Sequence, residues 1–208
     1  EWKDLSGNNH HLSSASGFGP QISSFSTLQG LDFFPEKGLQ AQAVPLGENV
    51  TIFMAIKPSA EIRTWGSYIH HGNHDDDWAI RMNGPPGSKT GFHSSNDNEI
   101  VHDFLDPNFT YVLVGRLETS PNSGTDRRLF KIFRSDGNES TISSSTLQKT
   151  ISSGVKPLYV GKSDSGESSN AKIGEILYFS SALADGDISV NASYLISKWM
   201  GAPSSTGG

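Results

Sequence analysis

Short runs of alternating apolar and polar residues follow one another along most of the chain, and Gly, Pro, Asn or Asp interrupts them at spacings of roughly 8–15 residues. This pattern is typical of antiparallel β-sandwiches and barrels, in which each strand turns one face to the core and one to solvent. It predicts strands at residues 31–34, 50–57, 66–72, 77–83, 89–95, 100–104, 111–117, 127–134, 155–160 and 172–179.

One segment near the C-terminus has helical periodicity instead. Ile188, Ala192, Leu195 and Trp199 recur at helical spacing within residues 187–200, and Gly201 follows as a stop signal. A lone helix of this length is marginal without tertiary burial, so Leu195 and Trp199 are expected to pack back onto the strands. The predicted fold class is therefore all-β with one short C-terminal helix.

The length of 208 residues favours a single domain, which we assign to residues 1–201. Residues 202–208 read Ala-Pro-Ser-Ser-Thr-Gly-Gly, a composition typical of a flexible linker or tail. We therefore expect further domains in a larger parent chain.

Charge and composition exclude several classes of partner. The net charge of -6 leaves no basic field to attract phosphate backbones, so nucleic acid is not expected as a partner. No apolar run approaches the ~20 residues that a membrane-spanning helix needs, so membrane insertion is not expected either. Cysteine is absent, which excludes disulfides and cysteine-based zinc sites.

Glycosylation signals bear on where the protein works. Ser and Thr make up about a fifth of the chain, a frequency at which chance supplies roughly two or three Asn-x-Ser/Thr sequons. The chain has four sequons, a mild excess over chance. In a chain without cysteine, this excess favours a secreted, extracellular glycoprotein over an intracellular protein. A used sequon must be accessible, so all four are expected to be at least partly exposed: Asn49, Asn108, Asn138 and Asn191.

Three stretches, in order along nearly the whole chain, carry a family resemblance. The opening reads W-K-D-L-S-G-N-N-H at residues 2–10. A second signature reads G-L-D-F-F at 30–34, followed by T-I-F-M-A-I-K-P at 51–58. The third reads I-G-E-I-L-Y-F at 173–179 and leads to Y-L-I-S-K-W at 194–199. Together they resemble the laminin-G-like domains of the concanavalin A-like lectin/glucanase superfamily.

This resemblance implies a two-sheet antiparallel jelly-roll sandwich whose concave sheet and loop tips bind ligands in many relatives. It does not imply one function, because relatives include lectins, adhesion modules, carbohydrate-binding appendages, hydrolases and lyases. The hydrolases carry an E-x-D-x-x-E strand that sets two carboxylates about 5 Å apart. No such strand occurs here, so hydrolase activity of that kind is not expected.

Residues 66–99 read as strands joined by tight turns, and counting from the turns gives their register. His71 then lies opposite Trp78 on the core face and is interpreted as structural. His70 lies in one row with His93 on the other face, and Tyr68 lies beside Arg81 in the next row. A slip of one residue would exchange the two faces.

The four residues of the second face are the candidate ligand-binding set: Tyr68, His70, Arg81 and His93. Tyr68 would offer a stacking surface to a sugar, and Arg81 and the imidazoles would donate to hydroxyls or carboxylates. Affinity for an acidic glycan is then expected to rise as the pH falls, and replacing Arg81 is expected to spare stability. The alternative is a solvated outer face without a ligand.

Acidic residues gather in the two turns that this path brings to one end of the sheet. Asp75, Asp77 and Asp97 are the candidate metal ligands there, because Ca²⁺ takes 6–8 oxygens in irregular geometry. The alternative is that these residues only form the turns and keep the sheet edge soluble.

Three functions remain open at this point. The favoured one is an extracellular, non-catalytic recognition or adhesion module that binds glycan or glycoprotein through the concave face and the rim loops. The second is a polysaccharide lyase, in which Arg81 neutralises a uronate while a histidine or Tyr68 abstracts a proton. The third is a structural domain of an extracellular filament or coat.

Overall fold

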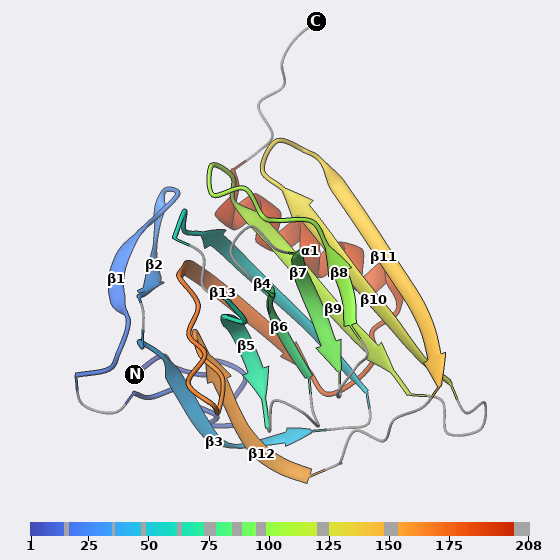
Figure 1. The fold of residues 1–208 in the computed structure, drawn as a ribbon, viewed down its shortest axis with the longest axis horizontal. Coiled ribbons are helices and arrows are strands. Elements are labelled where there is room, and N and C mark those ends of the chain that lie inside the picture. The colour runs from blue at the N-terminus through green and yellow to red at the C-terminus, as the bar shows by residue number, and fades with distance from the viewer. Residues whose placement is uncertain are drawn as a thin grey trace, which may run out of the picture.

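The computed structural model describes residues 1–14, 17–34, 36–46, 49–61, 64–72, 78–84, 89–94, 99–119, 125–147 and 154–201. Its strands form two antiparallel sheets that stack face to face (Figure 1). In order of hydrogen bonding, the seven-stranded sheet contains β1 (Gln21–Phe25), β2 (Leu28–Phe33), β13 (Ala171–Phe179), β4 (Val50–Pro58), β9 (Tyr111–Glu118), β10 (Thr125–Arg134) and β11 (Glu139–Leu147). The six-stranded sheet contains β3 (Leu39–Leu46), β12 (Gly154–Val160), β5 (Ser67–His71), β6 (Trp78–Asn83), β7 (Lys89–Ser94) and β8 (Glu99–His102).

The predicted all-β sandwich is confirmed, and each of the strands expected from the sequence is present with ends that differ by up to three residues. The sequence pattern missed β1, β3 and β11. In β11, six of nine residues are Ser or Thr, so the strand lacks the apolar alternation by which strands are recognised. It lies at the edge of its sheet, where it pairs with only one strand and packs little against the core, so few of its positions require an apolar residue.

The alternation of β4 explains how the layers are held together. Ile52, Met54 and Ile56 point into the core between the sheets, whereas Phe53 and Ala55 belong to a second cluster on the far side of the seven-stranded sheet. The strand is apolar on both faces because both are covered.

Helix α1 (Asp185–Trp199) forms that second cover (Figure 1). It buries Ile188, Ala192, Leu195 and Trp199, which confirms the predicted helical face. Trp199 packs so closely on β13 that a Cβ at Gly174 would lie 2.5 Å from its ring, inside any normal contact distance. Glycine at 174 is thus a requirement of helix docking.

Three stacked rings connect the two sheets inside the core. The ring of Trp78 lies 5.7 Å from that of His71 and 5.9 Å from that of Tyr178, and both pairs are nearly parallel. His71 Nε2 lies 3.1 Å from the Val44 carbonyl oxygen, and the Tyr178 hydroxyl donates to the Pro45 carbonyl over 2.7 Å. The structural role predicted for His71 is therefore confirmed.

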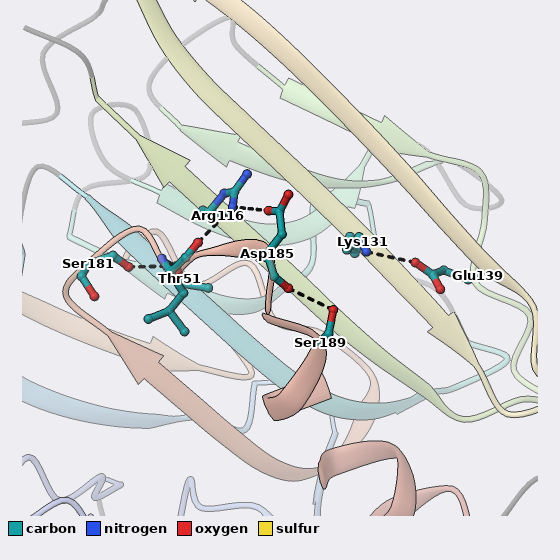
Figure 2. A network of polar contacts seen from close by, with 8 residues as sticks. Thr51, Arg116, Lys131, Glu139, Ser181, Asp185 and Ser189 are labelled. Carbon is teal, nitrogen blue, oxygen red and sulfur yellow. Dashed lines mark hydrogen bonds and ion pairs between the residues drawn. The ribbon is translucent and has the colours of Figure 1, made fainter. Parts of the chain in front are cut away.

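A buried threonine fixes the segment that leads into α1. The Thr51 hydroxyl donates to the Ser181 carbonyl over 2.8 Å and accepts from the Leu183 amide over 2.9 Å (Figure 2). Beside it, Arg116 Nη1 donates to the Leu183 carbonyl over 2.9 Å and to Asp185 over 2.6 Å. These contacts hold the start of the helix on the outer face of the sheet.

We expect Thr51→Val to lower the free energy of unfolding by about 1–3 kcal/mol, because it keeps the shape but leaves a backbone donor and acceptor unpaired. Ser189→Ala is the control, since the Ser189 hydroxyl only bonds the Asp185 carbonyl on the exposed side of the helix. Urea unfolding of both variants measures the difference. Equal stability of Thr51→Val and the wild type would contradict this role.

A carboxylate secures the other end of the helix. Glu175 accepts hydrogen bonds from the Tyr194 hydroxyl at 3.0 Å and the Trp199 indole at 2.9 Å, and it pairs with Lys198 at 2.8 Å. Burial alone would raise the pKa of Glu175, but the hydrogen bonds from Lys198, Trp199 and Tyr194 outweigh it and hold the pKa below its usual range.

Because the folded-state pKa of Glu175 is lowered, its contribution to stability is present above the unfolded-state pKa and is lost as the pH falls through the folded-state value. We expect Glu175→Gln to be less stable than the wild type by about 1–3 kcal/mol at pH 7. The difference should shrink progressively below about pH 4.5, the usual value for glutamate. Urea unfolding at stepped pH measures it, and a pH-independent difference would refute the assignment.

The four sequons lie on the surface, as expected. Asn108 and Asn138 are exposed, and Asn49 and Asn191 are partly exposed. Asn191 lies in α1 and donates to the Asp187 carbonyl one turn earlier over 2.8 Å.

Candidate functional site

The candidate site lies on the face of the six-stranded sheet that points away from the core. His70 lies opposite Ala79, and Ala79 lies opposite His93, as the sequence predicted. Tyr159 of β12 pairs with His70, and Glu99 of β8 pairs with His93. A single cross-strand row from β12 to β8, whose strands lie side by side in Figure 1, therefore carries these residues on the outer face.

Tyr68 does not join Arg81 on this face, which corrects the sequence-based expectation. The pairing shifts between Ser67 and Ile69 because β5 carries one extra residue there, and this bulge turns Tyr68 into the core. Tyr68 is 3% exposed, and its hydroxyl donates to Met82 Sδ over 3.0 Å. Burial raises the pKa of the Tyr68 phenol. Tyr68 offers a ligand neither a stacking surface nor a ready base.

His70 and His93 share the outer face but are not open to solvent. They are 1% and 2% exposed, so the open trough predicted from the sequence is absent at these residues. His70 Nδ1 lies 3.6 Å from a carboxylate oxygen of Asp164, in the loop between β12 and β13. The histidines therefore form a buried layer and do not line an accessible surface.

Arg81 is held between a carboxylate and an aromatic ring. Its Nη2 donates to Glu99 Oε1 over 2.8 Å, across β7 at the position where Gly91 has no side chain to stand in the way. Its guanidinium carbon lies 5.3 Å from the centre of the Trp65 ring. Arg81 and Glu99 side chains are 12% and 19% exposed, whereas Trp65 is 40% exposed. We call these three residues the Trp65–Arg81–Glu99 cluster.

Trp65 was not found by sequence reasoning. Its backbone lies in the left-handed region at φ 60°, which is rare for a bulky residue and costs free energy. Such strain recurs at binding sites, where the surrounding structure holds a side chain in place. Trp65 precedes β5 and lies outside its alternation, so the only signal in the sequence is an aromatic residue in a turn next to Gly66.

Tyr159 lies at the other end of the row and is half buried. Its ring centre is 5.9 Å from that of His70, and Lys162 Nζ lies 5.9 Å over it. Burial, aided by the negative charge of Asp164, raises the pKa of the Tyr159 phenol. The hydroxyl therefore stays protonated at neutral pH and both donates and accepts hydrogen bonds.

The candidate metal ligands Asp75, Asp77 and Asp97 lie outside the described residues, so calcium binding stays a prediction. Within the described part, no group of three or more His, Asp or Glu side chains is arranged to hold a metal ion.

Two cavities in the described part are small. One of about 10 Å³ lies beside Gly66 and Tyr68, and one of about 90 Å³ lies beside Phe133 and Ile196. Both are far below the ~300–1,000 Å³ typical of enclosed ligand sites. Neither of these two cavities is large enough to enclose an extended ligand.

No helix among the described residues has the length and apolarity to cross a lipid bilayer.

Comparisons with known proteins define the fold. No family model matches this chain, and no curated protein sequence matches it. Among solved structures, domain 4 of AbnA, a GH43 extracellular arabinanase from Geobacillus stearothermophilus, in complex with arabinotriose, has a TM-score of 0.62 at 12% identity, over 85% of this chain and 82% of that one.

Two further structures match over parts of longer chains. The binding domain of botulinum neurotoxin DC in complex with SialylT has a TM-score of 0.57 at 13% identity, over 93% of this chain and 48% of that one. Full-length tailspike protein 2 of Escherichia coli O157:H7 bacteriophage CAB120 has a TM-score of 0.60 at 11% identity, over 84% of this chain and 26% of the tailspike chain. The chain thus spans about a quarter of the tailspike. These neighbours share the β-sandwich, jelly-roll fold of this chain.

We expect the Arg81–Glu99 pair to contribute to stability, contrary to the expectation that replacing Arg81 spares it. A double-mutant cycle of Arg81→Gln, Glu99→Gln and the double variant measures the coupling energy of the pair. We expect about 1–2 kcal/mol, because the pair is largely shielded from water. The control is the more exposed Lys131–Glu139 pair at 3.1 Å (Figure 2), with an expected coupling below about 0.5 kcal/mol.

Urea unfolding measures both cycles. Equal couplings for the two pairs would show that Arg81 is not held by Glu99 in solution.

Proposed function

We propose that this domain is a non-catalytic glycan-recognition module that binds its ligand on the outer face of the six-stranded sheet. The observation that carries the proposal is the Trp65–Arg81–Glu99 cluster. It combines an exposed aromatic ring with a charged donor and a charged acceptor, which is the chemistry that sugar rings require.

The electrostatics of the cluster support binding over a purely structural role. A cation 5.3 Å from the ring centre holds the indole in place, so little side-chain freedom is lost when a ligand stacks on it.

The structural neighbours support the same class of ligand. The AbnA domain is described in complex with arabinotriose, and the neurotoxin domain in complex with SialylT. The signatures at residues 2–10, 30–58 and 173–199 support the narrower assignment to the laminin-G-like group. The surface-exposed sequons support a secreted protein that recognises glycans or glycoproteins outside the cell.

The lyase alternative receives less support. A lyase needs an accessible base within reach of the substrate proton. Tyr68 is buried in the core, and His70 and His93 are 2% exposed or less. Arg81, the intended partner of the uronate, already pairs with Glu99.

A glycan array tests the proposal. We expect Trp65→Asn to lower affinity for bound glycans at least about tenfold, because a stacking surface is lost while asparagine tolerates the left-handed backbone. Trp65→Phe should retain part of the affinity. The array is run with Ca²⁺ and with EDTA, because the sequence predicts calcium ligands at Asp75, Asp77 and Asp97.

The matched control is Tyr194→Asn on α1. Tyr194 is 46% exposed and lies under Lys198 at 5.2 Å, so it repeats the aromatic and cationic pairing of Trp65 on the opposite layer. Its replacement should leave glycan binding unchanged. The absence of binding by the wild type in both buffers, or equal losses in the two variants, would refute the proposed site.

A further inference from the structure

The Arg81 guanidinium and the His70 imidazole at the proposed site each lie beside a carboxylate. Arg81 Nη2 lies 2.8 Å from Glu99, and His70 Nδ1 lies 3.6 Å from Asp164. The chain as a whole carries a net charge of -6. A ligand carboxylate would have to displace Glu99 from Arg81, and Glu99 is tethered in the same sheet at a high effective concentration. The site is therefore poorly suited to an anionic sugar.

Among the described residues, two further cations of this face leave this balance in place. Lys89 lies opposite Asn83, two residues from Gly91, but it is exposed, so its attraction to a ligand carboxylate is weak and screened by salt. Lys162 lies further away. Lys162 stands beside Tyr159 of β12, and β12 is separated from β6 by β5. Two strand spacings amount to roughly 10 Å, so a single sugar ring that bonds Arg81 does not extend to Lys162.

The intact ion pair suits a neutral sugar well. A guanidinium only donates hydrogen bonds and a carboxylate only accepts them, whereas each sugar hydroxyl does both. Neighbouring hydroxyls can thus bond Arg81 with one group and Glu99 with the next, without breaking the pair. The apolar face of the same sugar would lie on the exposed indole of Trp65.

We infer that the ligand is a neutral saccharide that stacks on Trp65 and bridges Arg81 and Glu99 through its hydroxyls. This inference rests on the proposed function and replaces the sequence-based expectation of an acidic glycan. Glu99 becomes the residue that determines specificity, because it keeps the Arg81 charge from a ligand carboxylate.

Paired glycans that differ only in charge provide the test. Lactose is compared with sialyllactose, and methyl-esterified oligogalacturonate is compared with its free acid, on an array that also holds neutral arabinan, galactan and glucan fragments. We expect the wild type to bind neutral members and to disfavour each charged counterpart. Binding should change little between low and high salt, because no net charge is paired with the ligand.

Glu99→Gln should lower neutral-glycan affinity by about tenfold, since a charged acceptor becomes a neutral amide. It should also reduce or reverse the preference against the charged glycans, because no carboxylate then neutralises the charge of Arg81. Glu139→Gln is the control, as it removes the carboxylate partner of Lys131 in the other sheet. Circular dichroism shows whether each variant is folded. If Glu99→Gln does not fold, the preference of the wild type between neutral and charged glycans, and its salt dependence, test the inference instead.

The outcomes separate the two proposals. A wild type that prefers the charged member of each pair overturns the neutral-sugar inference and leaves glycan recognition standing. Neutral binding that Glu99→Gln does not alter overturns the role of Glu99. Binding to no glycan on the array overturns the proposed function and this inference with it.

Discussion

The stack of His71, Trp78 and Tyr178 fixes which residues of β5 and β6 face outward. Trp78 lies between the other two rings, and Tyr178 belongs to the opposite sheet. A one-residue slip of either strand would carry its aromatic ring out of the core, so the register is strongly specified. Because the side chains of a strand alternate, the same constraint directs His70 and Arg81 to the outer face.

The outer face then divides into a buried and an accessible part. His70 and His93 are covered, and the β-bulge removes Tyr68 to the core. In the proposed site the exposed ring is that of Trp65, which precedes β5; Arg81 supports the indole and Glu99 supports Arg81. The Trp65–Arg81–Glu99 cluster thus offers one aromatic surface beside one ion pair, and on this ground we propose that it prefers hydroxyl-bearing ligands to charged ones.

Much of the fold could be predicted because apolar alternation and turn residues mark most strands, and helical spacing marks α1. The strand β11 was not predicted, because a Ser- and Thr-rich edge strand lacks the apolar alternation. The register of β5, β6 and β7 followed from turn counting and is confirmed for His70, Ala79 and His93. A bulge leaves no trace in periodicity, so Tyr68 was misplaced. Trp65 was missed because its position depends on a tertiary contact with Arg81.

The indole N–H resonances of the four tryptophans offer the most direct measurement of where a glycan binds. Trp78 and Trp199 are buried, and Trp2 lies in the N-terminal segment, so each reports on a different region. During titration with the neutral oligosaccharide that binds best on the array, we expect the Trp65 signal to shift progressively while those of Trp78 and Trp199 stay fixed. Saturable binding that leaves the Trp65 signal unmoved would contradict the account.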